Sequence, residues 1–213
     1  PTWMLFIQWY NTTRNINDTS TKNPIGLPLT LATEPNQTPF HDRKEFCSFV
    51  VSNSCNKLRN DAFTVVNAYK RVNSGGQLFN NIGGPLQARY AGGGCGDVAK
   101  FRFLEEHKFN ICYENSRGNG YVTEKLLHAK MAGCIPIYWG DPHADEDFDP
   151  AGFVNLSSEK NPEKILEVIR ELEADTERCQ KMASVPALDS ERLSRARHSL
   201  RTMAMRICNL ALQ

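Results

Sequence analysis

The stretch "FNICYENSRGNGYVTEKLLHAKMAGCIPIYWG", residues 109–140, contains three elements of local structure in a row. It opens with "FNICYEN", an apolar run typical of a buried strand, and continues through a polar segment broken by glycines at 115–120. The amphipathic "YVTEKLLHAKMAG" then predicts a helix that ends at Gly133, and "CIPIYWG" predicts a second strand. A strand, a helix and a strand in this order are the unit from which parallel sheets are built.

The same alternation continues on both sides of this stretch. Apolar runs and helical spacing predict strands at 46–53 and 153–157 and helices at 58–71, 97–108 and 162–175, with two further helical stretches towards the C-terminus. We therefore expect an α/β fold, a Rossmann-like parallel sheet with flanking helices on both faces. Ligands of such sheets lie beyond the carboxyl ends of the strands, where the loops after "SFVVSN" and "NICYEN" are expected.

The N-terminal region differs from the rest of the chain. Residues 3–10, "WMLFIQWY", are interpreted as a strand, and residues 11–45 are rich in Asn, Thr and Pro, which is typical of a loop or linker. We expect an N-terminal segment at 1–45, too short for a second full domain. One domain follows at 46–213, compact to about residue 186 and ending in a helical tail.

Composition narrows the classes of partner. The chain has 213 residues with 25 Lys and Arg against 24 Asp and Glu, so its charge gives no reason to expect nucleic acid or a membrane surface as a partner. Its longest apolar runs fall far short of the ~20 residues that a spanning helix needs. The start at Pro1 shows no signal-peptide pattern, so we expect any signal or anchor to be absent from this chain.

The cysteines and glycosylation motifs leave the cellular compartment open. Seven cysteines are too few for a disulfide scaffold, and without a CxxC pair their spacing does not indicate a zinc site. Cys112 and Cys134 fall in predicted strands, where cysteine is usually a small apolar filler. Four N-x-S/T sequons would suit a secretory protein, although Asn-rich and Thr-rich loops also produce them by chance: Asn11, Asn17, Asn36 and Asn155.

Two loops carry the candidate chemistry. The first brings Arg59 to the start of a helix, where its fork of donors could meet a phosphate; the alternative is a solvated helix arginine. The second runs from Asn115 to Gly120, and its glycines allow a ligand close to the backbone. The helix after it opens with free N–H groups and the Lys125 charge, a combination that fits a pyrophosphate.

Two more residues of this second region could bind the rest of a nucleotide sugar. Tyr121 could lie against a flat base or ribose, and Glu124 could accept hydrogen bonds from sugar hydroxyls. The alternatives are that Glu124 only complements the helix dipole and that Lys125 is a solvated surface charge. The spacing fits neither G-x-G-x-x-G nor the P-loop.

Other chemistry is poorly supported by the sequence. The acidic run "HADEDFDP" at 143–150 is interpreted as a solvated turn, and we assign no metal. The histidines have no Ser or Cys partner in a triad arrangement, and a G-x-S-x-G motif is absent, so hydrolase chemistry is not favoured.

The quoted motifs resemble a known family. Residues 109–157 closely resemble the signature region of the α1,3/4-fucosyltransferases, glycosyltransferase family 10, whose pattern runs roughly F-x-x-C-F-E-N-S-x-x-x-G-Y-V-T-E-K and continues to P-I-Y-W-G-x-P and F-x-P-x-S-F. The upstream "FCSFVVSNSCNKLRNDAF" also resembles it, so that the likeness covers about 44–157. Tyr113 and "PAGF" depart mildly from the pattern.

The resemblance implies a fold and a set of site residues. Family members have the two-domain GT-B architecture and bind GDP-fucose mainly through the C-terminal domain, to which 46–213 would correspond, with 1–45 a remnant of the acceptor side. Carried over, Arg59 and Lys125 contact the donor phosphates, Tyr121 and Glu124 lie near guanosine or fucose, and Asn115 lines the pocket. The residues assigned to catalysis are Glu124, Arg59 and Lys125.

The reaction implied is an inverting transfer of L-fucose from GDP-fucose to a hydroxyl of a glycan acceptor containing N-acetylglucosamine or glucose, in α1,3 or α1,4 linkage. Arg59 and Lys125 would stabilise the leaving diphosphate without an obligatory metal or a tightly bound cofactor. The general base is expected on the acceptor side. The candidate carboxylates within 1–45 match no family segment: Asp18, Glu34, Asp42 and Glu45.

Several interpretations stay open at this level. The chain could be the donor half of a longer transferase, a short enzyme, a GDP-sugar-binding module that does not transfer, or an interaction protein that keeps only the fold. The resemblance further implies the Golgi lumen, through a membrane anchor outside this chain, for a eukaryotic protein and the cytoplasm for a bacterial one.

Overall fold

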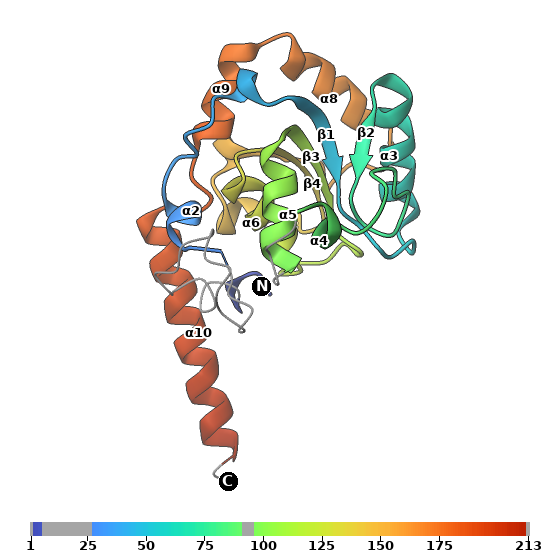
Figure 1. Cartoon of the computed structure of the whole chain (residues 1–213). Helices are drawn as coiled ribbons and strands as arrows, with labels where there is room; N and C mark the ends of the chain where they lie inside the picture. The colour runs from blue at the N-terminus through green and yellow to red at the C-terminus, as the bar shows by residue number, and fades with distance from the viewer. Residues whose placement is uncertain (1, 6–26, 91–95, 212–213) are drawn as a thin grey trace.

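The computed structural model describes residues 2–5, 27–90 and 96–211. Its centre is a five-stranded, fully parallel sheet in the order β2-β1-β3-β4-β5. The strands are β1 (Glu45–Phe49), β2 (Val72–Ser74), β3 (His107–Tyr113), β4 (Ile135–Trp139) and β5 (Val154–Asn155). The predicted parallel α/β sheet is therefore confirmed (Figure 1).

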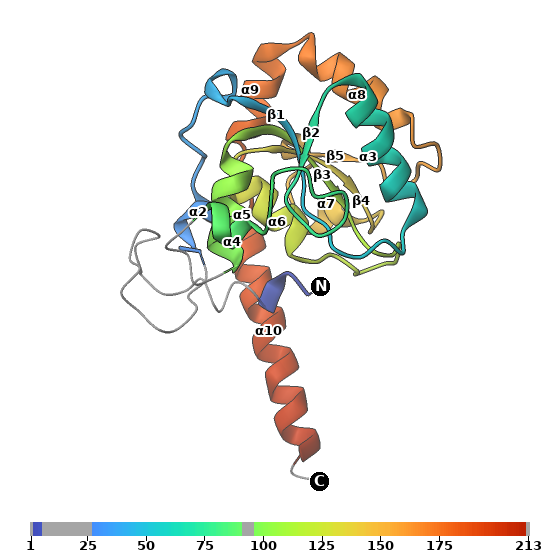
Figure 2. The same cartoon turned by 45° about the vertical axis from the view of Figure 1, so that its right-hand side comes forward.

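Helices cover both faces of this sheet. One face carries α3 (Lys57–Tyr69), α8 (Lys164–Glu173) and α9 (Thr176–Ser184), and the other carries α5 (Gly96–Glu105) and α6 (Glu124–Met131). Shorter helices complete the layers: α2 (Thr30–Thr33), η1 (Phe40–Asp42), α4 (Leu86–Arg89), α7 (Ala144–Asp147) and η2 (Pro150–Gly152). Figure 2 shows the last helix, α10 (Ser190–Ala211), extending away from the domain.

The period of two along β3 distributes its side chains between the two cores. Phe109, Ile111 and Tyr113 pack with the α3 and α8 side, whereas Cys112 packs with the α5 and α6 side. Since both faces are buried, the second half of the strand, residues 111–113, is a continuous apolar run, and the polar Asn110 before it is buried with its amide donating to Ser48.

The N-terminal part of the described chain packs onto the domain. Leu27 and Ala32 are buried in the core beneath α6, and the ring of Phe40 lies 5.7 Å from that of Phe109. The strand expected at 3–10 is wrong where it can be checked, because residues 2–5 form a turn and helical backbone; residues 6–10 lie outside the described ranges. The assignment of 1–45 to an acceptor side stays a prediction.

Two further elements differ from the sequence prediction, each for a simple reason. The sequence did not indicate β2, since this strand has three residues and pairs only with β1. The helix expected at 97–108 ends at Glu105, because His107 begins β3. Within the described ranges no helix combines the length and hydrophobicity needed to cross a membrane.

Candidate functional site

The two predicted loops meet where the strand order reverses. From β1 the chain crosses to β2 on one side, and from β3 it crosses to β4 on the other, so a topological switch point lies between neighbouring strands β1 and β3. Loops that leave such strands in opposite directions open a crevice at their carboxyl ends. Both candidate loops begin at this crevice.

Asn56 joins the two loops. Its side-chain oxygen accepts the backbone N–H of Arg59 at 3.1 Å and so caps α3, while its amide nitrogen donates to the carbonyl of Glu114 at 2.9 Å. An asparagine at a helix N-cap satisfies a backbone donor that would otherwise lack a partner. Here the same side chain also fixes the end of β3 against the start of α3.

Arg59 and Asn115, both predicted as site residues, are in direct contact. Nη1 of Arg59 donates to Oδ1 of Asn115 at 2.5 Å, and Nη2 donates to the carbonyl of Asn53. The arginine is completely buried, which lowers its pKa against the opposing influence of Cys55 and Glu114, and its Nε has no hydrogen-bond partner among the described residues. An unpaired buried donor of this kind fits a site that a ligand oxygen completes.

Glu114, which the sequence analysis did not single out, is the buried centre of the second loop. Its carboxylate is fully covered and accepts the N–H of Thr123 at 2.8 Å, the Thr123 hydroxyl at 2.8 Å and 2.9 Å, and the Lys125 ammonium at 2.9 Å. A carboxylate therefore already lies at the N-terminus of α6, where an incoming diphosphate was expected to find only donors. The glutamate of "YENS" was the available signal.

Lys125 and Glu124, neighbours in sequence, belong to two different ion pairs. Lys125 pairs with Glu114, and Glu124 pairs with Lys100 of α5 at 3.0 Å. Burial opposes the charged forms of both predicted residues, but the paired charges outweigh it: they raise the pKa of Lys125 and lower that of Glu124. Neither side chain is thus the solvated surface charge of the alternative interpretation, since Lys125 is 16% and Glu124 27% exposed.

Tyr121 ends the glycine-rich loop, two residues before Thr123, and is half-buried. Its backbone N–H donates to the Gly118 carbonyl at 3.1 Å, which closes a turn of this loop. Arg59, Asn115, Tyr121 and the Glu114–Lys125 pair thus form one cluster, which we call the switch-point site; Glu124 and Lys100 adjoin it on α6 and α5.

Two contacts hold the glycine-rich loop in place. The N–H of Gly120 donates to Asp141 at 2.5 Å, and Nε of Arg117 donates to the carbonyl of Ser157 at 2.7 Å. Gly120 has a φ of +73°, a conformation that favours glycine. The loop after β3 is therefore tied to the loops after β4 and β5, across the whole carboxyl edge of the sheet.

The acidic run at 143–150 contains helix α7, and Asp147 of this helix accepts the indole N–H of Trp3 at 2.9 Å. In residues 2–5, 27–90 and 96–211, no three His, Cys, Asp or Glu side chains are grouped as metal ligands would be. The six cysteines that the structure describes are free thiols, and both Cys112 and Cys134 are buried as predicted.

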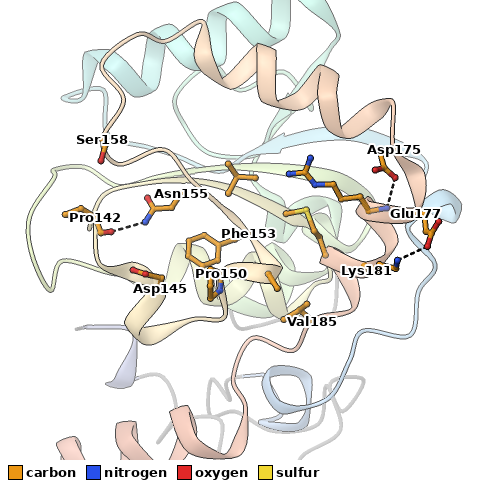
Figure 3. Close-up of a pocket in the computed structure, with 14 residues that line it drawn as sticks. Pro142, Asp145, Pro150, Phe153, Asn155, Ser158, Asp175, Glu177, Lys181 and Val185 are labelled. Atoms are coloured by element: carbon orange, nitrogen blue, oxygen red, sulfur yellow. Dashed lines mark hydrogen bonds and ion pairs between the residues drawn. The ribbon is translucent and has the colours of Figure 1, made fainter.

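A cavity of about 840 Å³ lies elsewhere, between β5, η2 and α9 (Figure 3). Three of its charged side chains are bonded within the protein: Lys181 pairs with Glu177 at 2.7 Å, and Asp175 accepts the Arg178 N–H at 2.9 Å. Asn155, one of the sequon residues, donates to the Pro142 carbonyl at 3.3 Å on its wall. No predicted site residue lines this cavity.

A parallel sheet with cations and hydrogen-bonding side chains gathered at its switch point is the arrangement in which open α/β proteins bind ligands. Comparison with known proteins makes the class specific. Residues 40–209 match the family model described as "Glycosyltransferase family 10 (fucosyltransferase) C-term". The chain belongs to glycosyltransferase family 10.

Similar proteins include fucosyltransferases of several organisms. An α-(1,3)-fucosyltransferase of Helicobacter pylori is 37% identical over 130 residues, covering 61% of this chain and 25% of that enzyme. α-(1,3)-Fucosyltransferase B of Drosophila melanogaster is 40% identical over 75 residues, 33% of this chain and 16% of its own length. GDP-fucose protein O-fucosyltransferase 3 of Bos taurus is 33% identical over 82 residues, 38% of this chain and 17% of that protein.

A crystal structure of an α1,3-fucosyltransferase with GDP-fucose resembles the fold with a TM-score of 0.61 and 33% identity, covering 72% of this chain and 42% of the crystallised one. The chain therefore spans less than half the length of the relatives that it matches. The likeness confirms the predicted GT-B type of C-terminal domain.

Proposed function

We propose that this chain binds GDP-fucose at the switch-point site and supplies the donor half of an inverting α1,3 or α1,4 fucosyltransferase. The observation that carries the proposal is the contact of Arg59 with Asn115 across the β1/β3 crevice of a family 10 domain. Supporting it, a solved relative was crystallised with GDP-fucose.

The proposed roles follow from charge and burial. Arg59 and Lys125 contact the neighbouring residues Asn115 and Glu114, and would stabilise the negative charge that develops on GDP as the fucosyl bond breaks. Asn115 is held by Arg59 and would line the phosphate site. Glu124, at the start of α6, would bind a ribose or sugar hydroxyl and remain ionised because Lys100 and Lys125 hold its pKa low.

Access to Arg59 requires a local rearrangement. Its guanidinium is covered by Asn115 and by the carbonyl of Asn53, so a phosphate oxygen would reach Nη1 only if the Asn115 side chain turned aside. Nε is buried as well and has no hydrogen-bond partner among the described residues, so the same rearrangement would give it one. We therefore propose that Asn115 exchanges its arginine contact for the ligand on binding.

The acceptor belongs to a separate part of the proposal. We propose a glycan hydroxyl on N-acetylglucosamine or glucose, with no general base assigned within this chain. Relatives named for α1,3-fucosylation and for protein O-fucosylation both match it, so the donor half alone does not set the acceptor. The proposed compartment is the Golgi lumen, with an anchor outside these residues, or the cytoplasm in a bacterium.

A donor-binding module without transfer of its own is the second candidate. It is compatible with the same cluster of Arg59, Asn115 and Lys125, because donor binding requires no general base. The two candidates share the GDP-fucose site and differ only in catalysis by the chain alone.

Calorimetric titration with GDP and GDP-fucose, followed by a transfer assay on N-acetyllactosamine, tests the proposal and separates its two forms. Binding with transfer supports a complete enzyme, and binding with transfer only after an acceptor-side half of a relative is added supports the donor half. Binding with no transfer in either assay supports the module. Absence of binding to both nucleotides would overturn the proposed function and leave an interaction protein with this fold.

A further inference from the structure

The last helix, α10, continues well past the domain from which it starts (Figures 1 and 2). Its base is held in place: the N–H of Leu188, just before the helix, donates to the Ala32 carbonyl at 2.8 Å, and Nη2 of Arg195 donates to the Glu146 carbonyl at 3.0 Å. Further along, every residue of 203–210 is exposed. The domain therefore sets the direction of α10, while no part of the chain that the structure describes covers its outer half.

One side of α10 is apolar from residue 193 to residue 210. Its apolar side chains recur at alternating intervals of three and four, which puts them on the same side of a helix. We call this side the α10 stripe; it consists of Leu193, Ala196, Leu200, Met203, Ile207 and Leu210. Ala196 is buried in the core beneath α5 and α6, and Leu193 packs against that core. The stripe thus begins inside the domain and leaves it on the side of the helix that faces the domain.

The outer part of the stripe is open. The exposed fraction of its side chains rises from 46% at Met203 to 59% at Ile207 and 72% at Leu210. Large apolar side chains gathered in this way mark surfaces that bind another protein or a membrane. A projecting helical segment without packing is also only marginally stable in water, because most helix stability in proteins comes from a buried apolar face. The outer stripe is therefore expected to be covered in the functional protein.

The covering surface has to lie on the domain's side of α10. Because Leu193 and Ala196 face the core, Ile207 and Leu210 face the space beside the domain, and a flat bilayer laid along the stripe would meet the domain itself. A second copy paired along the stripe would meet the same obstacle. It would also place like charges together, since α10 has one acidic residue, Glu191, against the arginines Arg192, Arg195, Arg197, Arg201 and Arg206. A body of protein beside the domain meets neither difficulty.

The position of the N-terminal residues indicates which protein this is. Trp3 belongs to the same core as Ala196, so residues 2–5 lie at the base of α10 (Figure 2). The matching family model is described as C-terminal, and this chain covers 42% of the crystallised relative, so relatives carry further chain ahead of the similar part. Chain that precedes the domain reaches it beside the stripe.

We propose that the outer stripe of α10, formed by Met203, Ile207 and Leu210, is the surface through which the donor half binds the acceptor-side half of the transferase. The inference rests on the proposed function, in which this chain supplies the donor half. α10 then fixes the acceptor-side half relative to the switch-point site, and the surface of that half opposite the stripe is apolar.

The test measures binding between this chain and the acceptor-side half of the Helicobacter pylori α-(1,3)-fucosyltransferase, whose folding circular dichroism checks. Calorimetry should show binding to the wild type, with the Kd raised at least about tenfold by the double variant Ile207→Ala/Leu210→Ala, because apolar groups buried in the contact are removed. Both positions are exposed in the free chain and alanine favours a helix, so the variant should keep its fold and its Kd for GDP.

Met205→Ala is the matched control. Met205 is an exposed apolar residue of the same part of α10 but lies outside the stripe, so its truncation is expected to leave the Kd for the acceptor-side half unchanged.

A second measurement does not require the acceptor-side half to fold alone. That half is fused ahead of residue 1 of the whole chain, and thermal unfolding is followed. The double variant should lower the Tm of the fusion by about 3 °C or more and leave the Tm of the unfused chain unchanged, since the stripe is covered only in the fusion.

The proposal is overturned if the wild type does not bind the acceptor-side half, if the double variant binds it equally well, or if Met205→Ala weakens binding as much. Sedimentation of the chain alone, and its flotation with vesicles of equal phosphatidylcholine and phosphatidylglycerol, test the other occupants. Self-association or vesicle binding that the double variant abolishes would assign the stripe to a second copy or to a lipid surface. Failure of docking with GDP-fucose binding intact removes this inference alone, whereas a wild type that binds neither nucleotide removes the proposed function.

Discussion

The carboxylate of Glu114, with no exposed surface, lies 2.9 Å from the ammonium of Lys125, which is 16% exposed. This pair joins the residue that follows β3 to the first turn of α6, eleven positions later in the sequence. Because the carboxylate is buried, the ammonium opposite it stabilises the fold as well as shaping the proposed phosphate site.

Glu114→Gln keeps the side-chain shape and removes the charge. We expect a loss of about 3 kcal/mol in the free energy of unfolding, because breaking a buried pair leaves the partner's charge uncompensated. Urea unfolding of Glu114→Gln and of the wild type measures this difference in free energy. Glu167→Gln, in the exposed pair with Lys164, should cost less than about 1 kcal/mol, and equal losses for the two variants would contradict the importance given to burial.

Lys125→Ala should weaken the binding of both GDP and GDP-fucose by about 1.5–3 kcal/mol, as for a charge-assisted contact to the diphosphate. Calorimetry at a temperature where the variant is fully folded gives the two dissociation constants, and Lys164→Ala is the control. Dissociation constants equal to those of the wild type would remove Lys125 from the phosphate site and leave it only its pairing with Glu114.

Asn56 has two separable tasks, the α3 cap and the bond to Glu114. Asn56→Ser keeps an oxygen for the cap and loses the donor to the Glu114 carbonyl, whereas Asn56→Ala loses both. We expect about 1 kcal/mol of lost stability for serine and a further ~1 kcal/mol for alanine. If denaturant unfolding gives the same value for both variants, the cap contributes nothing measurable.

Stability should fall in mild acid because of His107. Its Nδ1–H donates to the Phe103 carbonyl at 2.7 Å, its Nε2 accepts from the Asn73 amide at 3.0 Å, and burial lowers its pKa from 6.5 to about 4. The unfolded chain therefore takes up a proton first, so this contribution is complete above pH 6.5 and is lost as the pH falls towards 4. Burial lowers the pKa of His128 too, with the same sign.

Between pH 7 and pH 5 the His107 contribution amounts to about 2 kcal/mol of unfolding free energy. Urea unfolding at both pH values should show a weaker dependence for His107→Gln than for wild type, with His41→Gln, at an exposed position, behaving like wild type. If the free energy of unfolding of His107→Gln falls between pH 7 and pH 5 by as much as that of the wild type, groups other than His107 cause the acid sensitivity.

The sheet could be predicted because its central strands are buried on both faces and therefore contain continuous apolar runs, as residues 111–113 of β3 and the whole of β4 show. β2 could not, since Val72 is the only apolar residue among its three. The two site loops were placed correctly at neighbouring strand ends because the alternation of strands and helices implies a parallel sheet.

Within the site, the sequence identified individual residues but not the contacts that they make. Arg59 and Asn115 were chosen for their own chemistry, and only the fold brings them to 2.5 Å from each other. Glu114 resembled an ordinary polar residue after a strand, and Lys100 a helix surface charge 24 positions from Glu124. Such pairings depend on the packing of α5 against α6, which no local pattern of residues encodes.

Arg59 and Asn115 are separated by 56 positions of chain, and they meet only once β1 and β3 have paired. Closing so long a loop costs entropy before any contact forms, which makes this junction slow to assemble compared with the helices around it. In a refolding experiment, recovery of nucleotide affinity should thus trail the return of helical ellipticity and mark the moment when the middle of the sheet is complete.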